Sequence, residues 1–214
     1  MQNKRALFAD TGHFESGKET IMSNDFYAML SRMKYIDRWA LMRNTESESL
    51  MQHSFEVALL AHALATISNA RCGTALDADK AAVIGLFHDA SEILTGDMPT
   101  PVKYYSEEIR HAYKDVEQIA TEKLIGMLPE DLQPQYRDVM VPQPEDRELW
   151  KLVKAADKLS ALIKCVEEEK AGNQEFLKAR EATEEAIHKL DCPSAELFLT
   201  EFLPSYLLTL DQLK

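Results

Sequence analysis

The sequence predicts an all-α protein, a single-domain bundle of about seven helices in 214 residues. Glycine occurs only 7 times, whereas the helix-forming residues Ala, Leu, Glu and Lys are frequent. Apolar residues recur at helical spacing in several long segments, and no segment shows the alternation typical of β-strands. The content of 45% hydrophobic and 28% charged residues is that of a soluble globular protein, and a chain of this length needs only one core.

The folded domain is expected to begin near residue 21. Residues 1–20 carry scattered charges and no apolar helical pattern, so we expect them to be a flexible N-terminal extension of the domain formed by residues 21–214. Within this domain, helices are expected over residues 25–35, 49–68, 77–94, 106–128, 146–171, 174–190 and 194–210.

Apolar spacing predicts the first two helices. The apolar positions lie three or four residues apart at Phe26, Met29, Leu30 and Met33, and again at Val57, Leu60, Ala61 and Leu64. The stretch 36–46 between the two helices lacks this spacing and is expected to be a short connection.

Capping residues and helix breakers delimit the later helices. Asp77 or Asp79 can cap the third helix, and Gly96 ends it before the turn at 97–101, where two prolines oppose a helix. Ser106 can cap the fourth helix. Residues 129–145 contain four prolines and are expected to form a surface loop, and Gly172 is expected to end the fifth helix before the last two follow.

The formal net charge of -12 argues against partners that are polyanions. Nucleic acids and anionic membranes bind clustered Lys and Arg, so neither is an expected partner, whereas a small anion needs only a local positive site. No apolar stretch approaches the ~20 residues of a membrane span, and the first twenty residues do not form a signal peptide. The cysteines Cys72, Cys165 and Cys192 are widely spaced, as expected of free thiols in the reducing cytoplasm.

Polar residues of the types that bind metals lie near the end of the expected third helix. On a helix, His88 and Glu92 lie four residues apart and share one face, while Asp89 lies about 100° round the axis. The apolar residues Ala81 and Ile84 place this face toward the core, where unpaired polarity is costly. An acidic helix end at the surface with an incidental histidine is the alternative interpretation of these residues alone.

Two further helices direct a ligand-type side chain inward. His53 is in phase with the apolar residues of the second helix, and Asp157 shares a face with Val153, Ser160 and Ala161. A buried histidine can instead be held by a hydrogen bond alone. A single divalent ion such as Co, Mn, Zn, Ni or Fe would satisfy His53, His88, Asp89 and Asp157 together.

The order His53, then His88-Asp89, then Asp157 resembles the H...HD...D signature of the HD-domain phosphohydrolases. The flanking words resemble the bacterial 5'-deoxynucleotidases of that superfamily, from about Asn24 to the C-terminus. The words that carry the resemblance are Asp37-Arg38-Trp39, Leu41-Met42-Arg43-Asn44, Gln52-His53-Ser54, the run from Phe87 to Tyr104, and Lys154-Ala155-Ala156-Asp157. The resemblance implies an HD-type helical fold, a homodimer, and hydrolysis of 2'-deoxyribonucleoside 5'-monophosphates to deoxynucleoside and phosphate.

The resemblance also suggests roles for individual residues. Glu92 is the candidate to orient or deprotonate the attacking water, and Arg38 is the candidate to clamp the phosphate, since a guanidinium binds phosphate in a fork. The candidate substrate contacts are Arg38, Trp39, Asp89, Asp97 and Thr100. Packing of Trp39 in the core, and an ordinary turn role for Asp97, are the structural alternatives.

Other functions compatible with the same signature remain open. They are an HD-type hydrolase of triphosphates, cyclic nucleotides or alarmones, a non-catalytic helical module, and a purely structural metal site. Enzymes that act on more heavily charged phosphates need more cations than Arg38, Arg43 and Lys103 provide near the motifs. The remaining histidines, His13, His62, His111 and His188, fall outside the ligand pattern, which favours one metal ion per site.

Overall fold

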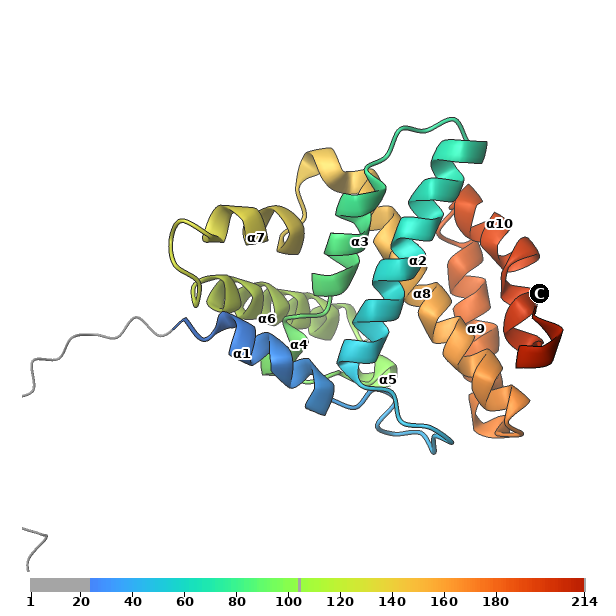
Figure 1. Ribbon diagram of the computed structural model, residues 1–214. Coiled ribbons are helices and arrows are strands. Elements are labelled where there is room, and N and C mark those ends of the chain that lie inside the picture. The colour runs from blue at the N-terminus through green and yellow to red at the C-terminus, as the bar shows by residue number, and fades with distance from the viewer. Residues whose placement is uncertain (1–23, 104, 214) are drawn as a thin grey trace, which may run out of the picture.

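Three helices form the centre of the fold: α2 (Leu50–Arg71), α3 (Ala78–Phe87) and α8 (Arg147–Lys170). These helices lie side by side in Figure 1, and their apolar side chains form most of the main hydrophobic core. The computed structural model describes residues 24–103 and 105–213, so the expected extension of residues 1–20 lies outside the described part. The all-α fold class expected from the sequence is confirmed for the described residues.

Shorter helices flank this centre on two sides. On one side, α1 and α6 pack with α7 around a second apolar cluster, and on the other side α9 and α10 cover α8 and α2, as Figure 1 shows. The bounds of the flanking helices are α1 Phe26–Leu30, α4 Glu92–Thr95, α5 Thr100–Lys103, α6 Glu107–Ile125, α7 Gln133–Met140, α9 Leu177–His188 and α10 Pro193–Glu201.

The start of α2 is fixed by a capping box. The Ser49 side chain accepts a hydrogen bond from the Gln52 amide, and the Ser49 amide donates to Gln52 Oε1 at 2.8 Å. Both bonds satisfy amides that a helix start otherwise leaves unpaired. This cap matters for the site, because it fixes where the first turn of α2, and with it His53, begins.

Close contact between α2 and α3 depends on Gly85. A Cβ atom built at Gly85 would lie 2.8 Å from Ala58 Cα, which belongs to the backbone of α2. We expect Gly85→Ala to reduce the free energy of unfolding by about 1–3 kcal/mol, because the helices must separate to admit the methyl group. Urea denaturation measures this loss. Val83→Ala, a change at a partly exposed position of α3, is the control, and equal stability of the Gly85 variant and the parent would contradict this packing.

The structure corrects several expected boundaries. The third helix ends at Phe87 instead of continuing to about residue 94, and residues 88–91 form a turn before α4. The expected loop at 129–145 contains α7, because Pro134 lies in the first turn, where proline is tolerated. Pro101 likewise lies in the first turn of α5. The last α-helix ends at Glu201 and continues as 3₁₀ turns.

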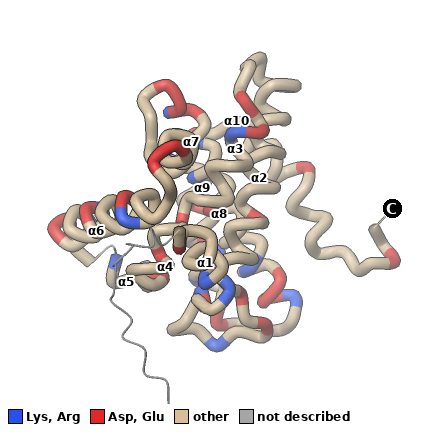
Figure 2. The backbone as a smooth tube through the Cα atoms, turned by 60° about the vertical axis from the view of Figure 1, so that its left-hand side comes forward, with Lys and Arg blue, Asp and Glu red and all other residues tan. Residues whose placement is uncertain are grey.

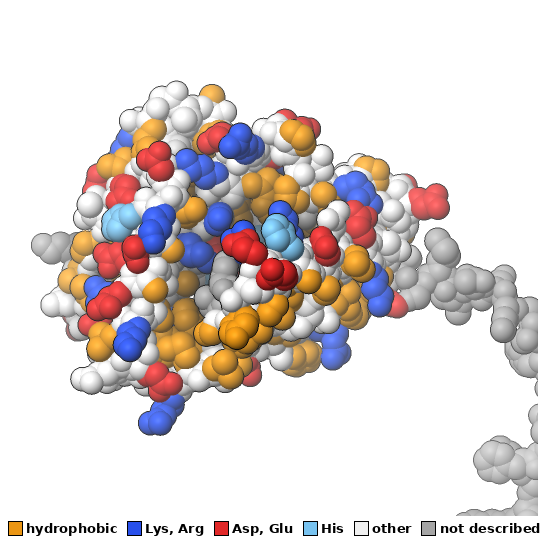
Figure 3. All heavy atoms as spheres, turned by 180° about the vertical axis from the view of Figure 1, so that it is seen from behind, with side chains coloured by type: hydrophobic (Ala, Val, Ile, Leu, Met, Phe, Trp, Pro, Cys, Tyr) orange, Lys and Arg blue, Asp and Glu red, His pale blue; other side chains and the backbone are white. Residues whose placement is uncertain are grey.

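The surface carries charges of both signs. On the face drawn in Figure 3, acidic and basic side chains are interspersed with apolar patches. Helices long and apolar enough to cross a bilayer are not found among the described residues. Cys72, Cys165 and Cys192 are all free thiols, as the spacing predicted.

Candidate metal and substrate site

Four ligand-type side chains from three distant stretches of chain meet at the centre of the bundle. His53 comes from the first turn of α2, His88 and Asp89 from the turn that follows α3, and Asp157 from the middle of α8. One ligand atom from each residue lies within 4.8 Å of every other. In the tube view, acidic and basic positions are distributed along most of the chain (Figure 2).

The imidazole nitrogens face the carboxylates directly. His53 Nε2 lies 3.3 Å from Asp157 Oδ1 and 3.6 Å from Asp89 Oδ2, and His88 Nε2 lies 3.0 Å from Asp89 Oδ2. His53 is fully buried, and the two imidazole rings lie 5.3 Å apart between centroids. Ligands that share one Zn-like ion at about 2.0–2.2 Å lie about 4 Å or less apart, and these three contacts fall within that limit.

The hydrogen bonds of both histidines suit metal binding. His88 Nδ1 donates to the carbonyl of Gly85 at 2.8 Å, and His53 Nδ1 bonds with Ser160 Oγ at 3.0 Å. Both Nε2 atoms are buried and have no hydrogen-bond partner. Since an imidazole that carries its proton on Nδ1 has a lone pair on Nε2, both rings present a metal-binding nitrogen to the cluster. Two imidazoles and two carboxylates therefore fit a borderline divalent cation.

The charges of the cluster keep both carboxylates ionised. Burial would raise the pKa of Asp89, but His88 and His53 outweigh burial and hold this pKa well below its usual range. Burial likewise opposes the charge on Asp157, yet Lys158 and His53 lower its pKa. Ionised carboxylates are the form that binds a cation.

In the metal-free protein, protons compete with a metal for His53. Burial and Arg38 oppose protonation of this imidazole, but Asp157 and Asp89 outweigh them and raise its pKa above the usual value. Metal binding must displace this proton, so acid should weaken binding.

Glu92 lies beside the cluster at the start of α4. Its side chain is buried, with 4% of its surface exposed, and Oε2 has no hydrogen-bond partner. Burial, reinforced by the negative charges of Asp89 and Asp97, raises the pKa of Glu92 to about 9 in the metal-free protein. The raised pKa makes Glu92 a strong base once it is ionised, and a cation bound at the neighbouring cluster would favour loss of its own proton.

Arg38 reaches the cluster from the loop that precedes α2. Its Nη1 atom lies 3.6 Å from Asp89 Oδ2, and its Nε atom donates to Glu48 Oε2 at 3.2 Å. Burial opposes the guanidinium charge, but the carboxylates of Asp157, Glu48 and Asp89 outweigh it and raise the pKa of Arg38. A fixed cation therefore lies at the edge of the candidate metal site.

Trp39 adopts a backbone conformation that is unusual for a residue with a side chain. Its φ angle is 58°, and its indole Nε1 donates to Glu48 Oε2 at 2.9 Å. Its ring also packs against Phe176, with the ring centroids 5.3 Å apart. Core packing and a role beside the substrate are thus compatible for Trp39, and strained backbone is often retained at functional sites.

The other sequence candidates are placed as follows. Asp97 follows Gly96 at the end of α4, and its charge contributes to the raised pKa of both Glu92 and Arg38. Thr100 begins α5, but its side chain lies outside what the structure describes. The backbone of Arg43 bonds to Glu175, which ties the loop to the segment before α9.

Sequence reasoning missed several residues around the site. Glu48 accepts hydrogen bonds from both Arg38 and Trp39, and Ser160 and Glu56 lie behind His53. Lys103 was expected only as one of the cations near the motifs; it bonds to Glu117 at 2.8 Å, and its charge acts on Glu92. The one available signal was Ser160, a polar residue on the apolar face that carries Asp157.

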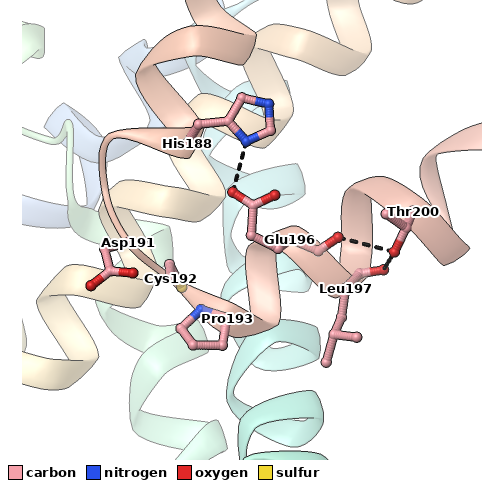
Figure 4. A pocket seen from close by; sticks show the side chains of 7 residues that line it. All are labelled: His188, Asp191, Cys192, Pro193, Glu196, Leu197 and Thr200. Atoms are coloured by element: carbon pink, nitrogen blue, oxygen red, sulfur yellow. Dashed lines mark hydrogen bonds and ion pairs between the residues drawn. The ribbon is translucent and has the colours of Figure 1, made fainter.

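A separate hollow lies between α9 and α10, as shown in Figure 4. His188 Nδ1 bonds with Glu196 Oε1 at 2.8 Å, and the Thr200 hydroxyl donates to main-chain carbonyls of its own helix. These polar groups are satisfied by one another, so we assign this hollow no part in the chemistry.

The sequence is similar to those of known 5'-deoxynucleotidases. The family described as 5'-deoxynucleotidase YfbR-like matches residues 25–206. A 5'-deoxynucleotidase of Pectobacterium atrosepticum is 46% identical over 188 residues, which cover 88% of this chain and 94% of that protein. A 5'-deoxynucleotidase of Vibrio vulnificus is 44% identical over 193 residues, which cover 90% of this chain and all of that protein.

Solved structures share the fold. An HD-domain phosphohydrolase from Listeria innocua superposes with a TM-score of 0.73 at 26% identity, covering 86% of this chain and 88% of that one. An HD phosphohydrolase of cyanophage S-2L, solved with dA and one catalytic Zn²⁺ ion, gives a TM-score of 0.59 at 20% identity, covering 84% of this chain and 95% of that one. With the H...HD...D residues gathered at one point of an all-α fold, the chain belongs to the YfbR-like 5'-deoxynucleotidase family.

Proposed function

We propose that this chain hydrolyses 2'-deoxyribonucleoside 5'-monophosphates to a deoxynucleoside and phosphate, using one divalent ion held by His53, His88, Asp89 and Asp157. The observation that carries the proposal is the convergence of these four side chains, with both Nε2 atoms buried and unpartnered. Cobalt, manganese or zinc suits this mixed nitrogen and oxygen ligand set. When bound, the ion neutralises phosphate charge and makes water a stronger nucleophile.

The surrounding residues have separate tasks in the proposed reaction. Arg38 presents its terminal nitrogens to the phosphate next to the cluster, and Glu48 fixes the Nε edge. Glu92 Oε2 accepts a hydrogen bond and then a proton from the attacking water. Asp97 bonds to the sugar 3'-hydroxyl or assists the leaving oxygen. Phosphoryl transfer requires mainly such positioning and charge stabilisation.

Asp89, Trp39 and Thr100 complete the proposed substrate contacts. Asp89 lies between the candidate metal and Arg38, so it borders the phosphate as well as serving as a ligand. Trp39 provides a flat wall against which a deoxyribose can pack, and its place beside Arg38 supports this role. Thr100, at the start of α5, is included on the family resemblance alone.

Phosphate release from a panel of nucleotides tests this function. The panel contains deoxy- and ribonucleoside 5'-monophosphates and the corresponding triphosphates, each with Co, Mn, Mg or Zn. We expect release from the deoxynucleoside monophosphates to be fastest and to stop when a chelator removes the metal. Equal turnover of the ribo and deoxy forms would overturn the sugar assignment, and activity confined to triphosphates would overturn the substrate class.

Glu48 provides a test of the substrate side of the site. We expect Glu48→Ala to lower kcat/KM by about 10–100-fold, mainly through KM, because Arg38 and Trp39 both lose their acceptor. Cobalt affinity should change little, since Glu48 is not one of the proposed ligands. Steady-state kinetics and a cobalt titration measure the two effects. The exposed Glu46→Ala is the control, and a Glu48 variant with unchanged KM would show that Arg38 needs no such support.

We also propose that the protein acts in the cytoplasm as a homodimer. The outer side of α2 exposes Met51, Phe55 and Leu59 at four-residue spacing, and such a row is suited to contact with a second copy. Light scattering coupled to size exclusion measures the mass. A monomer at micromolar concentration would contradict the proposal.

A further inference from the structure

The two histidines of the cluster are oriented by different kinds of partner. His88 Nδ1 donates to a main-chain carbonyl, that of Gly85, which no side-chain change can remove. His53 Nδ1 instead bonds to a side chain, Ser160 Oγ, at 3.0 Å. The His53 ring and Ser160 are both fully buried, so water does not supply an alternative partner. The orientation of His53 therefore depends on Ser160.

The direction of this hydrogen bond follows from a third residue. The Ser160 hydroxyl donates to Glu56 Oε2 at 2.6 Å, and an ionised carboxylate only accepts hydrogen bonds. The single proton of the hydroxyl is thus committed to Glu56, and Ser160 Oγ can only accept from His53. The proton of the neutral imidazole must then lie on Nδ1.

The other atoms near His53 Nδ1 do not compete with Ser160. Glu48 Oε1 lies 4.0 Å from Nδ1, which is beyond hydrogen-bond distance. On the opposite edge of the ring, Nε2 faces Asp89 and Asp157 and has no hydrogen-bond partner. A proton fixed on Nδ1 leaves a lone pair directed at the place where a metal would be bound.

We propose that Ser160, aligned by Glu56, is a positioning residue that fixes the tautomer and ring orientation of His53 for metal binding. The inference rests on the proposed function, because it requires His53 to be a metal ligand. We call the hydrogen-bonded chain from Glu56 through Ser160 to His53 the relay. Its two ends, His53 and Glu56, lie one turn apart on α2, and Ser160 lies opposite them on α8. The relay thus couples the packing of these two helices to the tautomer and orientation of the His53 ring.

A divalent metal without nucleotide is the probe for this inference, cobalt for affinity and diamagnetic zinc for NMR. We expect Ser160→Ala to raise the apparent Kd for Co²⁺ about 10–100-fold, measured by calorimetry and by the visible absorption of bound cobalt. Activity at saturating cobalt should recover most of its value, so the defect is in affinity and not in turnover. In the zinc-loaded parent, the Nδ1 proton of His53 should exchange slowly with solvent by NMR, and this signal should broaden or vanish in the variant.

Three further variants separate positioning from packing. Ser54→Ala removes an equally buried hydroxyl beside His53 that has no hydrogen-bond partner, so it should leave cobalt affinity unchanged. Ser160→Thr keeps the hydroxyl and should retain affinity. Glu56→Met removes the acceptor but leaves Ser160, and it should weaken binding less than Ser160→Ala does. Thermal unfolding of the metal-free proteins identifies a variant that does not fold.

The possible outcomes distinguish this inference from the proposed function. If the parent binds cobalt and Ser160→Ala binds it equally well, the positioning role is wrong and the metal site stands. An equal loss of affinity in Ser54→Ala would likewise reduce Ser160 to a packing residue. If the parent protein itself binds no cobalt, both the metal site and the relay are wrong.

Discussion

Glu92→Gln is expected to lower kcat by about two to four orders of magnitude while divalent metal remains bound. Glutamine has nearly the same shape but cannot accept a proton, and Glu92 lies beside the four proposed ligands without being one of them. Steady-state kinetics with a deoxynucleoside 5'-monophosphate and a cobalt titration measure the two properties on one preparation. If kcat stays within a few-fold of the parent, Glu92 has no proton-transfer role in the reaction.

The stability of the metal-free Glu92→Gln variant provides the folding control. The pKa of Glu92, about 9, lies above its usual value of 4.5, so the folded state favours the protonated form. This contribution to stability is full below about pH 4.5 and is lost as the pH rises toward 9. Because glutamine stays neutral, the metal-free variant should exceed the metal-free parent by on the order of 2–4 kcal/mol at pH 8. The two proteins should become similar near pH 5.

Asp89→Asn is expected to abolish most metal binding and activity together. Asp89 Oδ2 lies within 3.0–3.6 Å of His88 Nε2, His53 Nε2 and Arg38 Nη1, so it occupies the middle of the cluster. Loss of its negative charge should weaken cobalt binding at least about a hundredfold and lower kcat/KM at least about a thousandfold. Calorimetry and steady-state kinetics measure both.

A surface aspartate provides the matched control for Asp89. The side chain of Asp79 is 97% exposed on α3, and Asp79→Asn should leave both metal affinity and kcat/KM unchanged. An Asp89→Asn protein that binds cobalt within a few-fold of the parent would remove Asp89 from the ligand set.

Helical periodicity predicted the part of the site that depends on the faces of long helices. His53 is in phase with Val57, Leu60 and Leu64, and the structure buries all four. Asp157 was likewise expected to face inward from the fifth helix, and the structure directs it toward His53. Phase within a regular helix is a local property, so the sequence alone contains this information.

The region of His88 and Asp89 shows where periodicity fails. A continuous helix was expected, but α3 ends at Phe87. The next turn is closed by hydrogen bonds between residues three apart instead of four, such as Ala90 N to Phe87 O. The His88 side chain also donates to the Gly85 carbonyl, a local bond of the kind that competes with regular helical structure. Glu92 still lies beside Asp89, although not through the uninterrupted helical turn that the spacing predicted.

The contacts of the supporting residues could not be found from the sequence. Ser160 is 107 positions from His53, and which hydroxyl faces which imidazole depends on how α2 and α8 pack. Glu48 lies in an irregular loop, where no periodicity indicates direction, yet it orders both Arg38 and Trp39. Such contacts across the fold emerge only when the helices are placed relative to one another.

The central claim is that two imidazoles and two carboxylates from three distant stretches of chain bind a single cation. A crystal structure of the cobalt-loaded protein, with anomalous scattering recorded at the cobalt edge, tests it most directly. We expect one strong anomalous peak about 2.0–2.3 Å from His53 Nε2, His88 Nε2 and an oxygen each of Asp89 and Asp157. A peak elsewhere in the molecule, or full activity with this position empty, would contradict it.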